Sequence, residues 1–219
     1  MKRSITDVFK QINFLFIPYL IVLAACLIIA TVFTKEQIYF TFNSWHFTYG
    51  DVFFALWTNM GDGGVCVVIT IGLLFFSYRK GFLMGTSFIL TSVVAQVLKR
   101  IVATDRPVLF YKEQFSKIYL VKGVDMLETL SFPSGHTTSA FTAAVVLTYI
   151  TPRKAWGLVF FILAVLVGYS RMYLSEHFFE DVVGGSAIGV FVTVFWITWI
   201  DNKVFLGSPK WNRGLIKTR

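Results

Sequence analysis

The stretch "SFPSGHTTSAFTAAVVLTYI", from Ser131 to Ile150, joins a polar loop directly to an apolar run. Pro, Ser, Gly and His are ordinary together in a soluble loop, but polar groups are costly beside a membrane-spanning segment. The whole chain favours a membrane, because 56% of its 219 residues are hydrophobic and 15% are charged. Soluble domains carry about 25% charged residues. We therefore predict that this loop lies at a membrane boundary and has a function.

Six apolar runs follow one another along the chain. They are Asn13–Phe33, Gly64–Tyr78, Phe82–Leu98, His136–Ile150, Ala155–Tyr173 and Val182–Ile200. A full span needs about 20 residues, so the shorter second and fourth runs should extend into neighbouring polar segments. The sequence predicts an all-α, six-transmembrane-helix bundle that forms a single domain over residues 1–219. Met1–Gln11 is expected to form an interfacial helix, and the aromatic segment Thr34–Met60 to lie in the headgroup layer.

The basic residues are distributed unequally between the two sides of this bundle. With the N-terminus in the cytoplasm, twelve of the twenty Lys and Arg residues fall inside, opposed only by Asp7 and Asp201. This positive-inside pattern predicts an integral protein of the plasma (inner) membrane with both termini in the cytoplasm. The net charge of +8 is thereby explained by topology, so we expect no nucleic-acid partner, and the sequence indicates no obligate protein partner. Cys26 and Cys66 lie in apolar runs and suggest neither a disulfide framework nor a metal site.

Three polar clusters should meet at the outer end of the bundle. The first is "KRIVATDRP", in which Lys99 and Arg106 are seven residues apart, about two helical turns, and can face one point. Pro107 should end the helix near Arg106. The alternative interpretation is a basic membrane boundary with snorkelling side chains.

The second cluster is the loop at the start of the quoted stretch. Ser134 and Gly135 precede an apolar helix, whose free N–H groups and dipole attract an anion. Gly135 lets a ligand approach the backbone closely, and His136 can exchange a proton near neutral pH. A Ser N-cap in a Pro-Gly turn is the alternative.

The third cluster is "SRMYLSEHFFEDVVGG", from Ser170 to Gly185. His177 and Asp181 are four residues apart, on one face if this segment is helical. A carboxylate that is hydrogen-bonded to one imidazole nitrogen leaves the other nitrogen free to act as a nucleophile. Arg171 offers a planar fork of donors that matches phosphate oxygens, although a surface loop could carry the same residue types.

Together the clusters offer three cations, a helix N-terminus and two histidines. Such a cradle suits a phosphoryl group, whose negative charge is spread over several oxygens. A metal site is disfavoured because the three cations would repel a divalent ion, so no metal and no other cofactor is expected.

The complete pattern resembles the type 2 phosphatidic acid phosphatases and their vanadium haloperoxidase relatives. All eleven motif positions are present in order: Lys99, Arg106, Pro107, Pro133, Ser134, Gly135, His136, Ser170, Arg171, His177 and Asp181. The motifs cover residues 99–181, and outside them the resemblance is limited to the layout of six spans.

The resemblance implies metal-free hydrolysis of a lipid phosphate or diphosphate through a phosphohistidine. His177 would attack phosphorus while Asp181 holds its ring, and His136 would protonate the leaving oxygen. Five residues would bind the phosphate: Lys99, Arg106, Ser134, Gly135 and Arg171. With an extracytoplasmic site at the outer leaflet, undecaprenyl diphosphate and lipid A phosphates lead as substrates, with phosphatidylglycerol phosphate and phosphatidate as alternatives.

Other interpretations remain open at this point. The same site could transfer phosphate to a lipid, or the chain could be an anion-binding transporter without catalysis. A haloperoxidase fits less well because those enzymes are soluble. His46 has no obvious partner and is interpreted as interfacial. Five outer acids are expected mainly to screen charge as solvated groups or shape the entrance: Asp105, Asp125, Glu128, Glu176 and Glu180.

Overall fold

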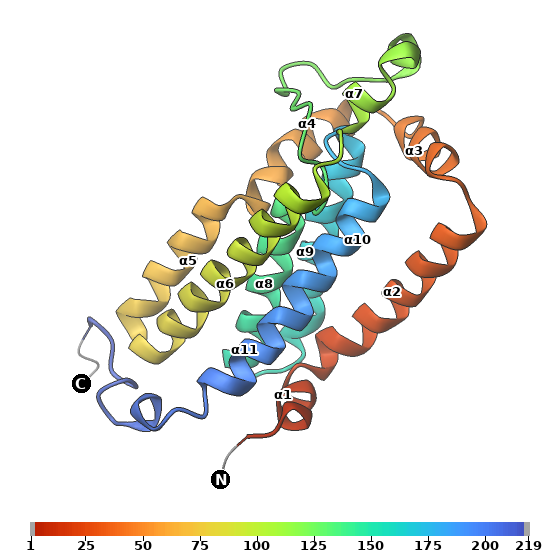
Figure 1. Cartoon of the computed structure of the whole chain (residues 1–219). Coiled ribbons are helices and arrows are strands. Elements are labelled where there is room, and N and C mark those ends of the chain that lie inside the picture. Colours follow the sequence, from red (N-terminus) through yellow and green to blue (C-terminus); the bar gives the residue numbers. More distant parts are fainter. Residues whose placement is uncertain (1–2, 217–219) are drawn as a thin grey trace.

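A computed structural model describes residues 3–216 of the chain, and over that range it holds only helices and their connections. The long helices are α2 (Asn13–Val32), α5 (Gly63–Phe76), α6 (Tyr78–Val102), α8 (Gly135–Ile150) and α9 (Trp156–Tyr173). A sixth long segment joins α10 (Phe179–Ala187), the π-helical turn η3 (Ile188–Val192) and α11 (Thr193–Ile200). Figure 1 shows these segments as a bundle, with shorter helices at both ends. The predicted all-α fold is confirmed.

Within residues 3–216, four segments are long and apolar enough to cross a membrane. They are Asn13–Val32, Tyr78–Phe110, Trp156–Tyr173 and Phe179–Ile200. A fifth candidate is the pair Thr48–Gly61 and Gly63–Phe76, which is bent by 54°. Each predicted apolar run is mostly helical, but α8 has only 16 residues, fewer than a full span needs. The chain is thus an integral membrane protein with four or five candidate spans, and the count of six stays a prediction.

Helix α8 lies inside the bundle and contacts α6, α9 and η3. Most of its residues are small or β-branched, including Ala140, Ala143 and Ala144, and most of them are buried. Small residues let helix backbones approach closely where lipid supplies no hydrophobic driving force. At Gly189 of η3 an added Cβ would lie 2.7 Å from the Thr138 carbonyl oxygen of α8, so only glycine fits this crossing. This packing fixes the first half of α8 against η3.

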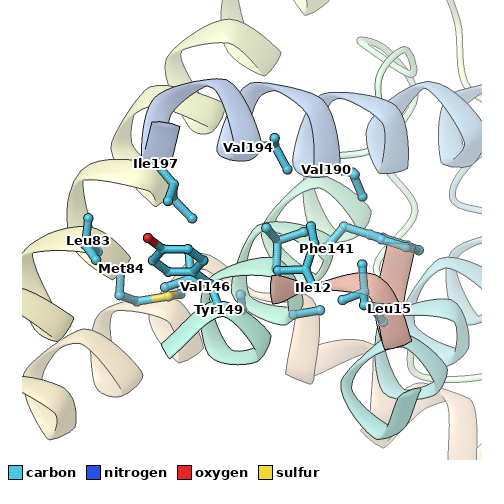
Figure 2. Close-up of a cluster of buried hydrophobic side chains, with 14 of the residues drawn as sticks. Ile12, Leu15, Leu83, Met84, Phe141, Val146, Tyr149, Val190, Val194 and Ile197 are labelled. Atoms are coloured by element: carbon cyan, nitrogen blue, oxygen red, sulfur yellow. The ribbon is translucent and has the colours of Figure 1, made fainter. Parts of the chain in front are cut away.

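One buried apolar cluster connects these helices (Figure 2). It includes Leu83 and Met84 of α6, Val146 of α8 and Ile197 of α11, each at most 1% exposed. The short helix α1 (Ile5–Gln11) joins the cluster through Val8. The predicted N-terminal helix is therefore present, and it packs against the bundle.

Asp201 ties several segments together at one end of the bundle. Its carboxylate pairs with Arg3 at 2.9 Å and with Arg79 at 2.5 Å, and it accepts a hydrogen bond from Tyr149 at 2.6 Å. At the same end, the N–H of Leu215 bonds to the Leu74 carbonyl. Both described ends of the chain therefore lie together, opposite α3 and α7 (Figure 1). Three residues used in the charge count, Lys2, Lys217 and Arg219, lie outside the described residues.

The segment predicted to lie in the headgroup layer forms two helices, α3 (Lys35–Asn43) and α4 (Thr48–Trp57), followed by the 3-10 turn η1 (Thr58–Gly61). At the same end, α6 ends before Ala103, which has a left-handed conformation (φ 47°), and Pro107 begins the short helix α7 (Pro107–Phe110). These elements and η2 (Lys112–Lys117) lie at the end of the bundle where α8 and α10 begin (Figure 1).

Candidate active site

The three predicted clusters meet at the end of the bundle opposite Asp201. Lys99 lies in the last turn of α6, Arg171 near the end of α9 and Asp181 in the first turn of α10. Arg106 precedes α7, and His177 lies in the turn between α9 and α10. All five of these side chains are less than a tenth exposed. Buried charges in a membrane protein mark a functional site by default.

His177 lies close to Asp181, as the spacing of four residues predicts, but it does so from the turn before α10 and not from the same helix face. The His177 Nδ1 lies 3.4 Å from Asp181 Oδ2. The same oxygen accepts hydrogen bonds from the Ser131 hydroxyl at 2.5 Å and the Phe178 N–H at 2.8 Å. These two donors fix the carboxylate, which in turn holds the Nδ1 side of the ring and leaves Nε2 free.

His177 is kept neutral by its surroundings. Burial, followed by the positive charges of Arg106 and Arg171, lowers the pKa of His177 well below its ordinary value of 6.5. A neutral imidazole has a lone pair on the nitrogen that carries no proton. The ring is therefore in the form that a nucleophile needs.

Ser134 caps α8 as the sequence indicates. Its hydroxyl accepts the Thr137 N–H at 3.4 Å, and its own N–H bonds to the Asp181 carbonyl at 3.0 Å. An ideal Cβ on Gly135 would meet nothing within 4 Å. The absence of a side chain thus leaves open space at a helix N-terminus, where an anion is favoured.

A cavity of about 220 Å³ opens beside this helix start. Gly135 and His136 line it from α8, and Ser92 and Gln96 line it from α6. Ser92, Gln96 and Lys99 are spaced by four and three residues, so they share one face of α6. His136 therefore faces a cavity that also has polar side chains in its lining.

Two of the predicted phosphate-binding residues also hold the loop before α8. The Lys99 ammonium donates to the Leu130 carbonyl at 2.6 Å, and the Arg106 Nε donates to the Thr129 carbonyl at 3.0 Å. The Arg171 Nη1 donates to the Thr58 hydroxyl at 2.6 Å, but the buried Arg171 Nε has no partner. An unpaired buried donor has lost its hydration without compensation, which favours a bound oxyanion at this position.

Glu176 corrects one expectation. The sequence placed it among solvated outer acids, but it is 4% exposed, and one of its oxygens pairs with both Arg106 and Arg171. Its position within the third motif was the available signal. Ser131 and Thr58 were also missed; Ser131 directly precedes the second motif, while nothing in the sequence singles out Thr58.

His46 is partnered, unlike the expectation for it. Its ring nitrogens lie 2.6 Å from the Asn43 carbonyl oxygen and 2.9 Å from that of Tyr173. The ring packs between Tyr119 and Tyr173, with centroids 4.1 and 4.2 Å away. His46 therefore joins α3 and α4 to the end of α9.

Among residues 3–216, no three His, Cys, Asp or Glu side chains are grouped as a metal ion requires. The donors around His177 are mainly cationic, and they fit an anion better than a cation. The metal-free chemistry predicted from the sequence concerns the reaction itself and stays a prediction.

Buried cations and histidines at one end of an apolar helix bundle suit a membrane-embedded enzyme that acts on phosphate groups. The model of the PAP2 superfamily matches residues 80–205, and the chain belongs to this superfamily.

Named relatives agree with this assignment. The chain is 32% identical over 154 residues to an undecaprenyl-diphosphatase of Sulfolobus acidocaldarius, covering 69% of each chain. It is 30% identical over 154 residues to phosphatidylglycerophosphatase B of Bacillus subtilis, covering 63% of this chain and 68% of that one. The crystal structure of Aquifex aeolicus LpxE is similar, with a TM-score of 0.67, 28% identity, and coverage of 75% of this chain and 94% of that one. The protein is therefore a lipid phosphatase.

Proposed function

We propose that this chain hydrolyses a lipid phosphate or diphosphate through a phosphohistidine on His177, without a metal ion. The observation that carries the proposal is the His177 ring, held at Nδ1 by Asp181, in a buried cluster with Lys99, Arg106 and Arg171; burial and these charges lower its pKa, which favours the neutral ring. A neutral nucleophile beside three cations suits attack on an anionic phosphorus, because the cations stabilise charge on the oxygens.

In the first step, the lone pair on His177 Nε2 attacks phosphorus and forms a P–N bond. The P–O bond to the leaving group breaks, and its oxygen takes a proton from His136. The Nδ1 proton stays on the ring and is donated to Asp181, which stabilises the positive charge that the ring acquires.

In the second step, water attacks the phosphohistidine. His136 accepts a proton from the water, the P–N bond breaks, and His177 returns to its neutral form. Orthophosphate is released. Lys99, Arg106, Arg171, Ser134 and Gly135 would bind the phosphoryl oxygens in both steps.

The cavity beside His136 supports the position of the leaving group. Because His136 is the proposed acid, the leaving oxygen must lie on its side, where Ser92 and Gln96 line the cavity. We infer a substrate whose lipid part is joined through a polar group on this side. Undecaprenyl diphosphate and a lipid A phosphate both meet this description; phosphatidylglycerol phosphate and phosphatidate are the alternatives.

We further propose six spans in the inner membrane, with both termini in the cytoplasm and the site facing outward. The grouping of Arg3, Arg79 and Asp201 at the end opposite the site supports this orientation, since basic residues favour the cytoplasmic side. Single cysteines at the exposed positions Glu113 and Lys210, in a background without Cys26 and Cys66, test it. An impermeant maleimide should label the E113C variant in intact cells, and the K210C variant only after permeabilisation. The reverse result contradicts the orientation.

The function is tested by phosphate release from purified protein on a panel of these four lipids, with and without chelator. We expect release from at least one lipid in the presence of chelator. His177→Ala should abolish turnover while vanadate still binds. Full activity in that variant rules out the covalent mechanism. Phosphate release only when an acceptor lipid is present indicates transfer rather than hydrolysis.

A further inference from the structure

Glu176 occupies the arginine pair that the proposed function assigns to phosphate. One of its carboxylate oxygens pairs with Arg106 Nη1 and lies 3.2 Å from Arg171 Nη2. Arg106 and Arg171 are each 6% exposed, and Glu176 is 4% exposed. Lys99, Arg106 and Arg171 are the three cations of the proposed phosphate cradle. An internal anion is therefore already bound between two of them.

The backbone holds this carboxylate in place. Ser175 takes a left-handed conformation (φ 57°), and the N–H groups of Glu176 and His177 both bond to the Arg171 carbonyl, at 3.0 and 3.1 Å. The Glu176 carbonyl accepts a further bond from Arg106 Nη1 at 3.1 Å. The turn therefore directs the Glu176 side chain back onto the arginines, and these backbone bonds do not depend on its charge.

Two buried guanidinium groups repel each other and have lost hydration, so an empty cradle needs a counter-ion. Glu176 supplies it. When a phosphoryl group binds, the carboxylate remains within the same buried cluster and repels it, since nearby like charges interact strongly away from water.

We propose that Glu176 is the resident counter-ion of the phosphate cradle, a positioning residue that holds Arg106 and Arg171 ready and limits how tightly the site retains free orthophosphate. This inference rests on the proposed function, because it takes the arginine pair to be the phosphate site. The consequence is faster product release, because a phosphatase must release one orthophosphate per turnover. Arg171 Nε, buried and unpaired, remains available to the substrate while Glu176 occupies Nη2.

The test is Glu176→Gln, which removes the charge but keeps the size of the side chain and the backbone bonds. The matched control is Glu180→Gln, which removes the same charge from the first turn of α10, where Glu180 is only partly buried. Orthophosphate binding is measured by calorimetry on the purified chain. We expect the E176Q variant to bind orthophosphate about tenfold tighter than the wild type, as for loss of one close buried like charge, and E180Q to match the wild type. Unchanged or weaker binding by E176Q overturns the proposal.

A kinetic measurement adds a second, independent result. E176Q should lower KM and kcat together on a lipid substrate, with stronger inhibition by orthophosphate, because product leaves slowly. A structural defect would instead raise KM. Should E176Q fail to fold, Glu176→Asp keeps the charge and should retain orthophosphate binding close to that of the wild type; a tenfold loss of binding in E176D contradicts the proposal.

The calorimetry also separates this inference from the proposed function. In a His177→Ala background no phosphohistidine can form, yet the comparison between Glu176 and Gln at this position is still measurable. A wild-type protein that releases no phosphate from any lipid overturns the proposed function. It leaves the effect of Glu176 on orthophosphate binding to be decided by the calorimetric result.

Discussion

The Ser131 hydroxyl donates a hydrogen bond to the Asp181 carboxylate at 2.5 Å, and so joins the loop before α8 to the first turn of α10. Both side chains are buried. The same Asp181 oxygen lies 3.4 Å from His177 Nδ1. The loop that delivers the helix N-terminus thus also orients the carboxylate behind the proposed nucleophile.

Ser131→Ala should therefore lower kcat without changing KM. Loss of a hydrogen bond to a charged group is worth about 1.5–3 kcal/mol, which corresponds to about 10- to 100-fold in rate. Steady-state kinetics on the lipid that the wild type hydrolyses best measures the effect. Ser44→Ala is the control, because Ser44 is exposed and bonds only its own helix. An unchanged kcat in S131A means that Asp181 does not need this donor.

Gly135→Ala should lower activity while leaving the fold intact. No heavy atom lies within 4 Å of the added Cβ, so the methyl group enters the open space at the start of α8, where phosphate is proposed to bind. We expect KM to rise and orthophosphate binding to weaken.

Gly72→Ala is the matched control, because its Cβ also meets nothing within 4 Å and Gly72 lies in α5, away from the site. Both variants should keep or slightly raise the melting temperature, since alanine stabilises a helix by roughly 0.5–1 kcal/mol over glycine. If the G135A variant is as active as the G72A variant, the phosphate does not bind at the start of α8.

The six helical segments could be predicted because apolar runs are a local property of the sequence, and a membrane selects for them. The convergence of Lys99, Arg171 and Asp181 also followed from counting spans. The interior position of α8 did not, since a run of apolar residues reads the same whether it faces lipid or other helices. The small residues of α8 are explained only by its close packing against α6 and α9, which the sequence alone does not show.

The role of Glu176 was hidden for a different reason. Glu176 and Glu180 lie in the same polar stretch, and nothing local tells which one turns inward. The left-handed residue Ser175 decides it, and a left-handed serine has no reliable sequence signature. His46 was missed because its ring lies between Tyr119 and Tyr173, which are distant in the chain.

Gln96→Leu should discriminate between lipid and small substrates. Gln96 is exposed on α6, where a polar side chain facing lipid is unfavourable, and it lines the cavity beside His136. Its loss should raise KM for a lipid diphosphate by about tenfold, the value of one hydrogen bond to a charged group. Hydrolysis of p-nitrophenyl phosphate should be unchanged, because its small leaving group does not extend to Gln96.

Arg100→Leu is the control, because it changes an exposed polar residue of the same helix outside the cavity lining. Equal KM changes for both substrates exclude a role in binding the leaving group.

The neutral state of His177 predicts how the enzyme responds to acid. Its pKa is lowered by burial and then by the charges of Arg106 and Arg171, so the folded ring binds a proton only well below pH 6.5. The sign follows directly: as pH falls through 6.5, an ordinary histidine loses its free lone pair, but His177 keeps it. The acid limb of kcat/KM that belongs to the nucleophile should therefore lie below pH 6.5.

The protonation of His177 can also be measured directly. The chain has three histidines, so ring-nitrogen NMR of labelled protein can follow each one, and the resonance that is missing in His177→Asn identifies this residue. The urea-unfolded chain, in which histidine titrates near its reference value of about 6.5, serves as the comparison. Below pH 6.5 the His177 ring of the unfolded chain binds a proton, whereas the ring of the folded chain does not. The free energy of unfolding should therefore fall as pH drops below 6.5, and the H177N variant should lack this contribution to the pH dependence. A His177 resonance that titrates at or above 6.5 would mean that the ring is charged in the resting enzyme and cannot attack phosphorus.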